Sequence, residues 1–150
     1  MQLSDHFTLG ELVHSDVASR KGIDNTPDAD LIPNLKDVST HILEPVRLHF
    51  DQAFAPTSGF RCLELNRLIG SGDNSQHVKG EAVDFVIPGV DNFTIAEWVY
   101  RNLTFDQLIL ECYRPGEPSS GWVHCSFVAD NPRGEVLTYT GKEYLNGLVS

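Results

Sequence analysis

The sequence predicts an α+β fold in which N-terminal helices pack on a mostly antiparallel sheet. Two observations support this prediction. In the first third of the chain, apolar residues recur at three- or four-residue spacing, which indicates an amphipathic helix. In the second half, short strand-forming segments are separated by turn residues. The chain of 150 residues has the length of one domain, spanning residues 1–150, and is long enough to bury a core.

The amphipathic helix is expected to begin just after the segment 24–27. Thr26 is the expected N-cap, and Pro27 suits the first helical turn. Pro45 lies inside the apolar pattern, where a proline removes a helical hydrogen bond and kinks the helix. The apolar positions that define the helix are Leu31, Leu35, Val38, Ile42, Val46 and Phe50.

The other expected elements are shorter. Two further helices are expected over residues 63–69 and 94–102. Because the late strands are joined by short connections, we expect them to pair antiparallel. Strands are expected over residues 57–61, 82–87, 105–113, 121–128 and 135–140.

Composition argues against several functional classes. The chain has 21 acidic and 11 basic residues, which gives a formal net charge of −10. Such a chain is a poor candidate for binding nucleic acid or an anionic membrane through bulk electrostatics. The three cysteines, Cys62, Cys112 and Cys125, are too few for a disulfide scaffold and suit a reducing compartment. With no visible secretory signal and no apolar run long enough to span a bilayer, we expect the protein to be made in the cytoplasm. We also expect a monomer.

Asp84 does not suit the apolar strand in which it lies. Strand alternation places it on the same face as Ala82 and Val86. A buried carboxylate needs a cation or strong hydrogen-bond donors to offset its desolvation. Taken alone, Asp84 is better explained by a salt bridge to Arg61 or Arg67, or by exposure at a sheet edge.

A zinc site would explain Asp84 together with two histidines. His124 lies in a later strand, where a single histidine is more often a hydrogen-bonded core residue. His77 lies seven residues before Asp84, and Gly80 between them can take the positive φ that turns a loop into a strand. Two imidazoles and one carboxylate with an open fourth position match a catalytic zinc site. Cys125 neighbours His124 but should point to the opposite face of its strand.

The segment 75–84 resembles the Ser-x-His-x-x-Gly-x-Ala-x-Asp signature of the zinc D-alanyl-D-alanine carboxypeptidases and L-alanyl-D-glutamate endopeptidases. That family includes phage endolysins and shares its fold with the hedgehog signalling domain. A later Trp-x-His motif matches Trp122 and His124, and the segment 58–61 is similar to the family's Ser-Gly-Tyr-Arg. The resemblance covers nearly the whole chain. The five fixed positions of the signature are Ser75, His77, Gly80, Ala82 and Asp84.

The resemblance implies a role for each matching residue. Ser75 and Trp122 would contact the substrate. Arg61 would hold a substrate carboxylate or polarise the scissile carbonyl, since a guanidinium stays charged and donates bidentate hydrogen bonds. Alternatively, Arg61 is a structural partner of a nearby acid, and Ser75 caps its own loop. The implied ligands of a Zn²⁺ ion are His77, Asp84 and His124.

The sequence departs from the family at the general base. Many members carry an acid three residues before the last zinc histidine, where this chain has Gly121. The best substitute is Glu111, which ends an apolar strand run; Glu81 and Asp106 are weaker candidates. Glu111 would accept a proton from water, while zinc and Arg61 stabilise the oxyanion. Alternatively, Glu111 lies on an exposed face at the end of its strand.

The implied function is hydrolysis of peptidoglycan stem peptides by a phage or prophage lysin that acts on the cell wall after release. The sequence does not distinguish carboxypeptidase from endopeptidase activity, because no motif indicates which side chains of the substrate are recognised. The alternative is a non-catalytic zinc-binding module or a virion structural component with the same fold. Gly121 is the best support for that alternative. A zinc amidase that acts on another small substrate is a third option.

Overall fold

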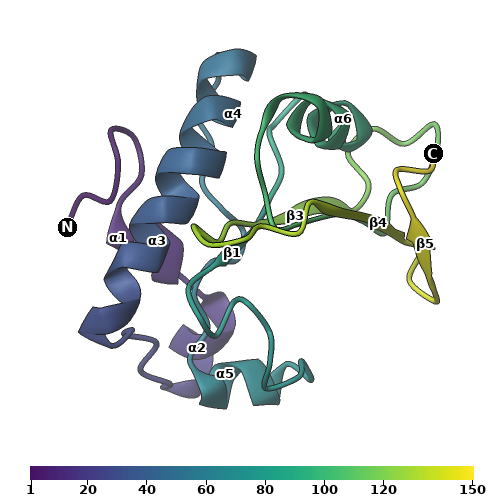
Figure 1. The fold of residues 1–150 in the computed structure, drawn as a ribbon. Coiled ribbons are helices and arrows are strands. Elements are labelled where there is room, and N and C mark those ends of the chain that lie inside the picture. Colours follow the sequence, from purple (N-terminus) through teal and green to yellow (C-terminus); the bar gives the residue numbers. More distant parts are fainter.

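One long helical segment and one five-stranded sheet dominate the computed structural model, which describes residues 1–150 (Figure 1). The long segment lies near strand β1 at one edge of the sheet, and helix α6 lies over one face. The predicted α+β class is confirmed. The helices are α1 (Leu9–Val13), α2 (Asp16–Lys21), η1 (Ala29–Leu31), α3 (Ile32–Val38), η2 (Ser39–Leu43), α4 (Glu44–Phe50), α5 (Leu63–Leu68) and α6 (Asn92–Asn102). The strands are β1 (Ala82–Phe85), β2 (Gln107–Glu111), β3 (Trp122–Ser126), β4 (Glu135–Tyr139) and β5 (Tyr144–Asn146).

Helices α1 and α2 are defined by their side-chain caps. Thr8 and Glu11 form a capping box, in which the Thr8 hydroxyl accepts from Glu11 N at 3.2 Å and the Glu11 carboxylate accepts from Thr8 N at 3.0 Å. Ser15 accepts from Ala18 N at the start of α2. With five and six residues, both helices are too short to show an apolar period, so apolar spacing does not predict them.

The long helical segment begins later than the sequence predicts. Thr26 is not its N-cap, because the Thr26 N–H and hydroxyl both donate to Asp24 Oδ1, at 3.0 and 2.6 Å, in a local turn. The segment starts instead after Asp28 with the 3₁₀ turn η1, and Pro33 occupies the first turn of α3. Pro27 therefore lies before the helix, and the prediction that it begins the first turn was wrong.

The interruption expected at Pro45 takes the form of a π-helical turn, η2, between α3 and α4. The N–H of Glu44 donates to the carbonyl oxygen of Ser39, five residues earlier. Pro45 then falls in the first turn of α4, where a missing N–H is tolerated. The apolar face of the segment is fully buried at Leu35, Val38, Ile42 and Val46.

The sheet has the strand order β1-β3-β2-β4-β5 and is mostly antiparallel. Strand β3 pairs antiparallel with both β1 and β2, and β5 pairs antiparallel with β4. The prediction that all late strands pair antiparallel was wrong for β4, which runs parallel to β2. The connection 127–134 carries the chain from β3 past β2, so that β4 joins the far side of β2 in the same direction. This crossover places β4 and β5 at the edge of the sheet opposite β1.

The hydrophobic core fills the space between the helices and the sheet. It joins residues of the long segment, such as Ile42, to Ile95 of α6 and to Val123 and Cys125 of β3. Burial of this apolar surface is the main contribution that holds the helices on the sheet. None of the helices combines the length and the apolar character needed to cross a bilayer.

The segment before α5 does not become a strand, although it reaches the sheet. Residues 57–61 form only one bridge, Ser58 to Asp84, through Asp84 N donating to Ser58 O at 2.7 Å. Asn25 holds this segment from the other side. Its side-chain amide donates to the carbonyl oxygens of Val13 and Phe60, at 2.8 and 3.0 Å, and its Oδ1 accepts from Cys62 N at 2.7 Å. The segment is therefore fixed between the N-terminal helices and β1.

We expect Asn25→Ala to lower the free energy of unfolding by about 2–3 kcal/mol, because it leaves three backbone groups without their partner. Asn34→Ala is the matched control, since Asn34 makes one exposed hydrogen bond, to Lys79 O at 2.9 Å. Its loss should cost under about 1 kcal/mol. Urea unfolding followed by circular dichroism measures both values. Equal losses for the two variants would contradict this role of Asn25.

Candidate metal centre and its cleft

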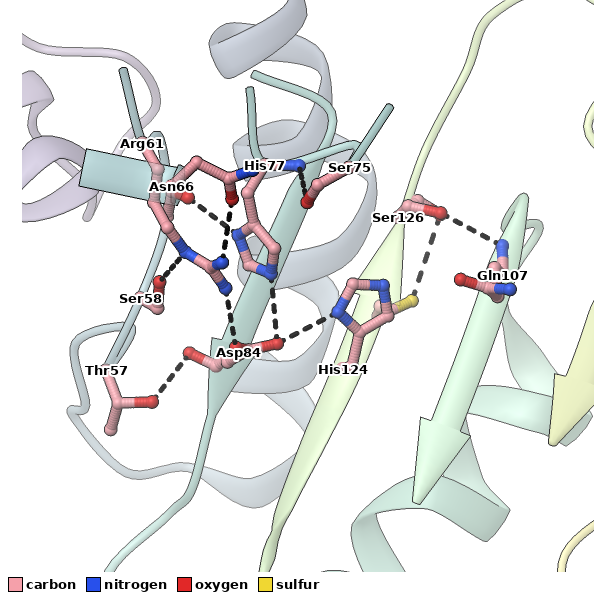
Figure 2. A network of polar contacts seen from close by, with 12 residues as sticks. Thr57, Ser58, Arg61, Asn66, Ser75, His77, Asp84, Gln107, His124 and Ser126 are labelled. Carbon is pink, nitrogen blue, oxygen red and sulfur yellow. Dashed lines mark hydrogen bonds and ion pairs between the residues drawn. The ribbon is translucent and has the colours of Figure 1, made fainter. Parts of the chain in front are cut away.

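Three metal-binding side chains converge from a loop and two paired strands. His77 lies in the loop before β1, Asp84 on β1 and His124 on β3, and the register of β1 and β3 places Asp84 directly opposite His124. One donor atom from each residue lies within 4.8 Å of the others. Asp84 Oδ1 lies 3.3 Å from His77 Nε2 and 2.9 Å from His124 Nδ1 (Figure 2). The three residues are only 3 %, 9 % and 9 % exposed.

The orientation of His77 is set by the backbone of the segment 57–61. His77 Nδ1 lies 2.7 Å from the carbonyl oxygen of Gly59, which can only accept, so Nδ1 carries a hydrogen. In neutral His77, Nε2 is therefore an unprotonated donor atom aimed at the Asp84 carboxylate. Two electron-pair donors that face each other in a buried site need a cation or a proton between them. The second-sphere contact to Gly59 thus fits a metal-binding histidine.

Gly59 can approach His77 only because it has no side chain. A Cβ at this position would collide with the carbonyl oxygen of Leu12. The same Leu12 carbonyl accepts a hydrogen bond from Phe60 N at 2.7 Å. Helix α1 therefore sets the position of the carbonyl that orients the histidine.

Gly80 lies three residues after His77, in the turn before β1. It has a φ of 71°, so its expected positive φ is confirmed.

His124 faces the Asp84 carboxylate through Nδ1, whereas His77 faces it through Nε2. Nδ1 faces Asp84, whereas Nε2 is buried and has no hydrogen-bond partner. Cys125, the next residue, belongs to the hydrophobic core on the opposite face of the strand, as expected from strand alternation. Its thiol therefore does not belong to the donor set, which consists of two imidazoles and one carboxylate.

The Asp84 carboxylate stays ionised despite its burial. Burial opposes the charge, but the adjacent His77 and His124 rings outweigh it and hold the pKa of Asp84 below its usual value. The salt bridge considered for Asp84 involves Arg61, whose NH2 lies 3.6 Å from Asp84 Oδ2. Arg67 does not take part, because it pairs with Asp73 at 2.8 Å on the surface.

Arg61 is held in place by neutral partners. Its Nε donates to Ser58 Oγ and its NH1 to Asn66 Oδ1, both at 3.1 Å. Burial lowers the pKa of Arg61, and the charges of Asp84 and Glu111 oppose that effect. A guanidinium keeps its charge under such shifts. Arg61 therefore places a fixed positive charge beside the three donors (Figure 2).

The donors face a cleft of about 550 Å³. Ser75 lines this cleft. It also accepts a hydrogen bond from His77 N at 3.3 Å and so caps its own loop, which was the alternative role expected for it. Trp122 lines the cleft too, and its indole N–H is buried. Both residues expected at the substrate therefore lie at the cleft. The other lining residues include Arg61, Gln76, Gln107, Ile109, Glu111, Arg133 and Tyr144.

Glu111 brings a further carboxylate into this cleft. It is half-buried at the end of β2, and the register places it opposite Trp122. Burial raises the pKa of Glu111, and the charge of Asp84 adds to this, whereas His124, Trp122 and Arg61 oppose it. A raised pKa suits a group that first accepts and then returns a proton near neutral pH.

The two weaker candidates for the base are engaged elsewhere. Asp106 accepts hydrogen bonds from Arg133 and Gln76, and Glu81 accepts one from Gln76 at 3.2 Å. Neither carboxylate lines the cleft. Glu111 is therefore better placed than both for a role in catalysis.

The backbone leaves no room for an acidic side chain at Gly121, the position where the sequence resemblance implies an acid. It has a φ of 66°, and a Cβ would collide with the carbonyl oxygen of Glu111 and lie 2.7 Å from the carbonyl carbon of Cys112. The backbone at Cys112, with a φ of 56°, passes directly over Gly121. Position 121 therefore has no room for any side chain.

The lining residues that the sequence did not predict include Tyr144 of β5, Arg133 of the crossover and Gln107 of β2. Strand β5 has only three residues, which is too short for an alternating pattern. The parallel pairing of β4 then brings the end of the chain back towards Glu111. No local signal in the sequence predicts that approach.

A family model described as Peptidase M15 matches residues 5–126. The chain belongs to the peptidase M15 family. The resemblance to the zinc carboxypeptidases and endopeptidases is thereby confirmed, and the matched segment includes the three donors, Arg61 and Glu111. This family is zinc-dependent, and its members are metallopeptidases. No curated protein matches the chain.

The match to the M15 family ends at Ser126, the last residue of β3. Strands β4 and β5 lie outside the matched segment, together with the crossover that precedes them. The M15 match therefore covers the candidate metal donors but not Arg133 or Tyr144, which line the same cleft.

We expect Gly121→Ala to lower the free energy of unfolding by about 3 kcal/mol or more, because the new Cβ meets backbone that cannot move aside. Gly22→Ala is the matched control. Gly22 has the same φ of 66° but nothing within 4 Å of its Cβ, so only the backbone cost of about 1 kcal/mol applies. Thermal unfolding of both variants separates the cost of the steric collision from the cost of a positive φ for a residue with a Cβ. A Gly121→Ala loss no larger than that of Gly22→Ala would refute the close approach.

Proposed function

We propose that this chain is a zinc peptidase that hydrolyses peptidoglycan stem peptides. It acts either as a D-Ala-D-Ala carboxypeptidase or as an L-Ala-D-Glu endopeptidase. One observation carries the proposal: the His77, Asp84 and His124 donors face the same cleft as Glu111 and Arg61. Two imidazoles and one carboxylate leave a coordination position open, which is typical of catalytic zinc sites. Membership of the M15 family supports the same reading.

The proposal extends to the biological setting. We infer a phage or prophage lysin that is made in the cytoplasm and acts on the cell wall after release. This part rests on the resemblance of the segment 75–84 to endolysins of the family.

The donor atoms that would hold zinc are His77 Nε2, His124 Nδ1 and an oxygen of Asp84. Zinc at such a site polarises a carbonyl and lowers the pKa of water. The chain contributes the orientation of the donors, since Gly59 fixes the His77 ring and the β1–β3 register fixes His124 relative to Asp84. Ionised Asp84 offsets part of the charge of the metal.

Glu111 and Arg61 would perform the steps that need a proton and a fixed charge. The Glu111 carboxylate accepts a proton from the attacking water and returns one to the nitrogen of the leaving amine. The Arg61 guanidinium donates to the substrate through NH2, whose contact to Asp84 at 3.6 Å is longer than a hydrogen bond. A charge that is already oriented needs no reorganisation when negative charge develops on the carbonyl oxygen.

A non-catalytic zinc-binding module or virion component is the second candidate, and Gly121 is the observation that favours it. The carboxylate of Glu111 enters the same cleft from the neighbouring strand, which favours the peptidase. Digestion of purified peptidoglycan discriminates between the two candidates.

We expect the zinc-loaded protein to release fragments from peptidoglycan, and a chelator to abolish this release until zinc is restored. Mass spectrometry of the fragments reports both the activity and the bond that is cut. Loss of terminal D-Ala indicates a carboxypeptidase, and cleavage after L-Ala indicates an endopeptidase. Stoichiometric zinc without released fragments would instead favour the binding module.

We expect Glu111→Gln to reduce turnover at least about 100-fold, because the amide cannot accept the proton. Zinc content, measured by elemental analysis, should be unchanged, since Glu111 is not among the three donors. Glu97→Gln is the control, because Glu97 lies on α6 and is paired with Arg101 outside the cleft. Turnover in Glu111→Gln that equals the wild type would rule out this base.

A further inference from the structure

We propose that the cleft contains a second binding subsite, centred on Arg133, that takes a carboxylate of the peptide substrate. The inference rests on the proposed function and names the chemistry that this part of the cleft would recognise. Arg133 lies in the crossover between β3 and β4, outside the segment that matches the M15 family, and it lines the same cleft as the three donors.

The backbone around Arg133 is fixed by Asp106, which directly precedes β2. Arg133 N donates to Asp106 Oδ1 at 3.0 Å, and Glu135 N donates to Asp106 O at 2.9 Å. Gly134 N donates to Phe105 O at 3.1 Å. The crossover is thus attached to the segment 105–106 at three successive residues. Arg133 does not depend on a mobile loop for its position.

The Asp106 carboxylate also orients the guanidinium. Arg133 NH2 lies 2.8 Å from Asp106 Oδ2, and Nε lies 3.2 Å from both oxygens. The Asp106 side chain is 6 % exposed and also accepts from Gln76 Nε2 at 3.0 Å. These contacts lower the pKa of Asp106, with the hydrogen bond from Arg133 as the main cause. A buried, ionised carboxylate therefore fixes one edge of the guanidinium before any ligand binds.

The other edge of the guanidinium has unused hydrogen-bond donors. NH1 lies 3.7 Å from Glu135 Oε1, beyond hydrogen-bond distance, and that oxygen already accepts from Gln107 Nε2 at 2.6 Å. The Arg133 side chain is 55 % exposed, and the residue lines the cleft. NH1 and the second hydrogen of NH2 thus remain available, in the fork geometry that matches a carboxylate.

The charges around the cleft give Arg133 a distinct role. Arg61 and Arg133 are the only arginine or lysine residues in the cleft lining, and three acids, Asp73, Asp84 and Glu111, line it as well. Arg61 uses its Nε and NH1 for Ser58 and Asn66, its NH2 faces Asp84, and its side chain is largely buried, whereas the Arg133 side chain is exposed to the cleft. A carboxylate of the substrate would be repelled by the three acids, and Arg133 is the arginine of this lining that offers it an exposed edge.

Stem peptides offer two such carboxylates, one on the α-carbon of D-Glu and one at the C-terminus. Four forms of the pentapeptide L-Ala-γ-D-Glu-L-Lys-D-Ala-D-Ala distinguish them: neither carboxylate amidated, either one amidated, or both. We expect Arg133→Gln to raise KM about tenfold on the unamidated peptide, with kcat little changed. On the doubly amidated peptide, the wild type and Arg133→Gln should have the same KM. The singly amidated peptide on which the difference disappears identifies the carboxylate.

Two variants separate recognition from structure. Arg101→Gln removes an exposed arginine outside the cleft and should leave all four KM values unchanged. Arg133→Lys keeps the charge and should recover part of the affinity for the unamidated peptide. An equal rise in KM for Arg133→Gln on all four peptides, or no rise on any, would overturn the subsite while leaving the proposed function intact. A wild type that cleaves none of the four would overturn the proposed function and the subsite with it.

Discussion

The site depends on one constraint, the need to hold the charge of Asp84 inside a protein strand. A buried carboxylate is tolerated only with positive or hydrogen-bonding partners around it. The antiparallel register of β1 and β3 supplies His124 from directly opposite, the turn before β1 supplies His77, and the segment 57–61 supplies Arg61. Each partner comes from a different part of the chain. The core that packs the helices on the sheet therefore also assembles the candidate metal centre.

The helices reach the site through the backbone and not through catalytic side chains. Helix α1 fixes the segment 57–61 through the Leu12 carbonyl, and Gly59 of that segment orients the ring of His77. Asn25 attaches the same segment to the N-terminal part of the chain. The N-terminal third of the protein thus sets the tautomer of a histidine that lies far away in the sequence.

Much of this arrangement could be predicted from the sequence, because Asp84 and His124 conflict with the strands that contain them, and such conflicts mark functional sites. The long helix, α6 and the strands from β1 to β4 follow from apolar patterns. Thr26 was misplaced, since a Thr after Asp forms a local turn as readily as a helix cap. The parallel pairing of β4 and the approach of Tyr144 depend on tertiary packing, for which no local pattern exists. The sequence showed that position 121 lacks the expected acid, but only the structure shows why a glycine is needed there, because the backbone of residues 111–113 leaves no room for a side chain.

The contact between Gly121 and the backbone of residues 111–112 also limits how this protein can evolve. A single substitution cannot place a carboxylate at position 121, because any side chain there would collide with the carbonyl oxygen of Glu111 and the backbone of Cys112, which follows β2. The backbone of β2 would have to shift first, and that shift would move Glu111 itself. The acid at position 111 can therefore be lost in one substitution, whereas a carboxylate at position 121 would first require the backbone of residues 111–113 to move.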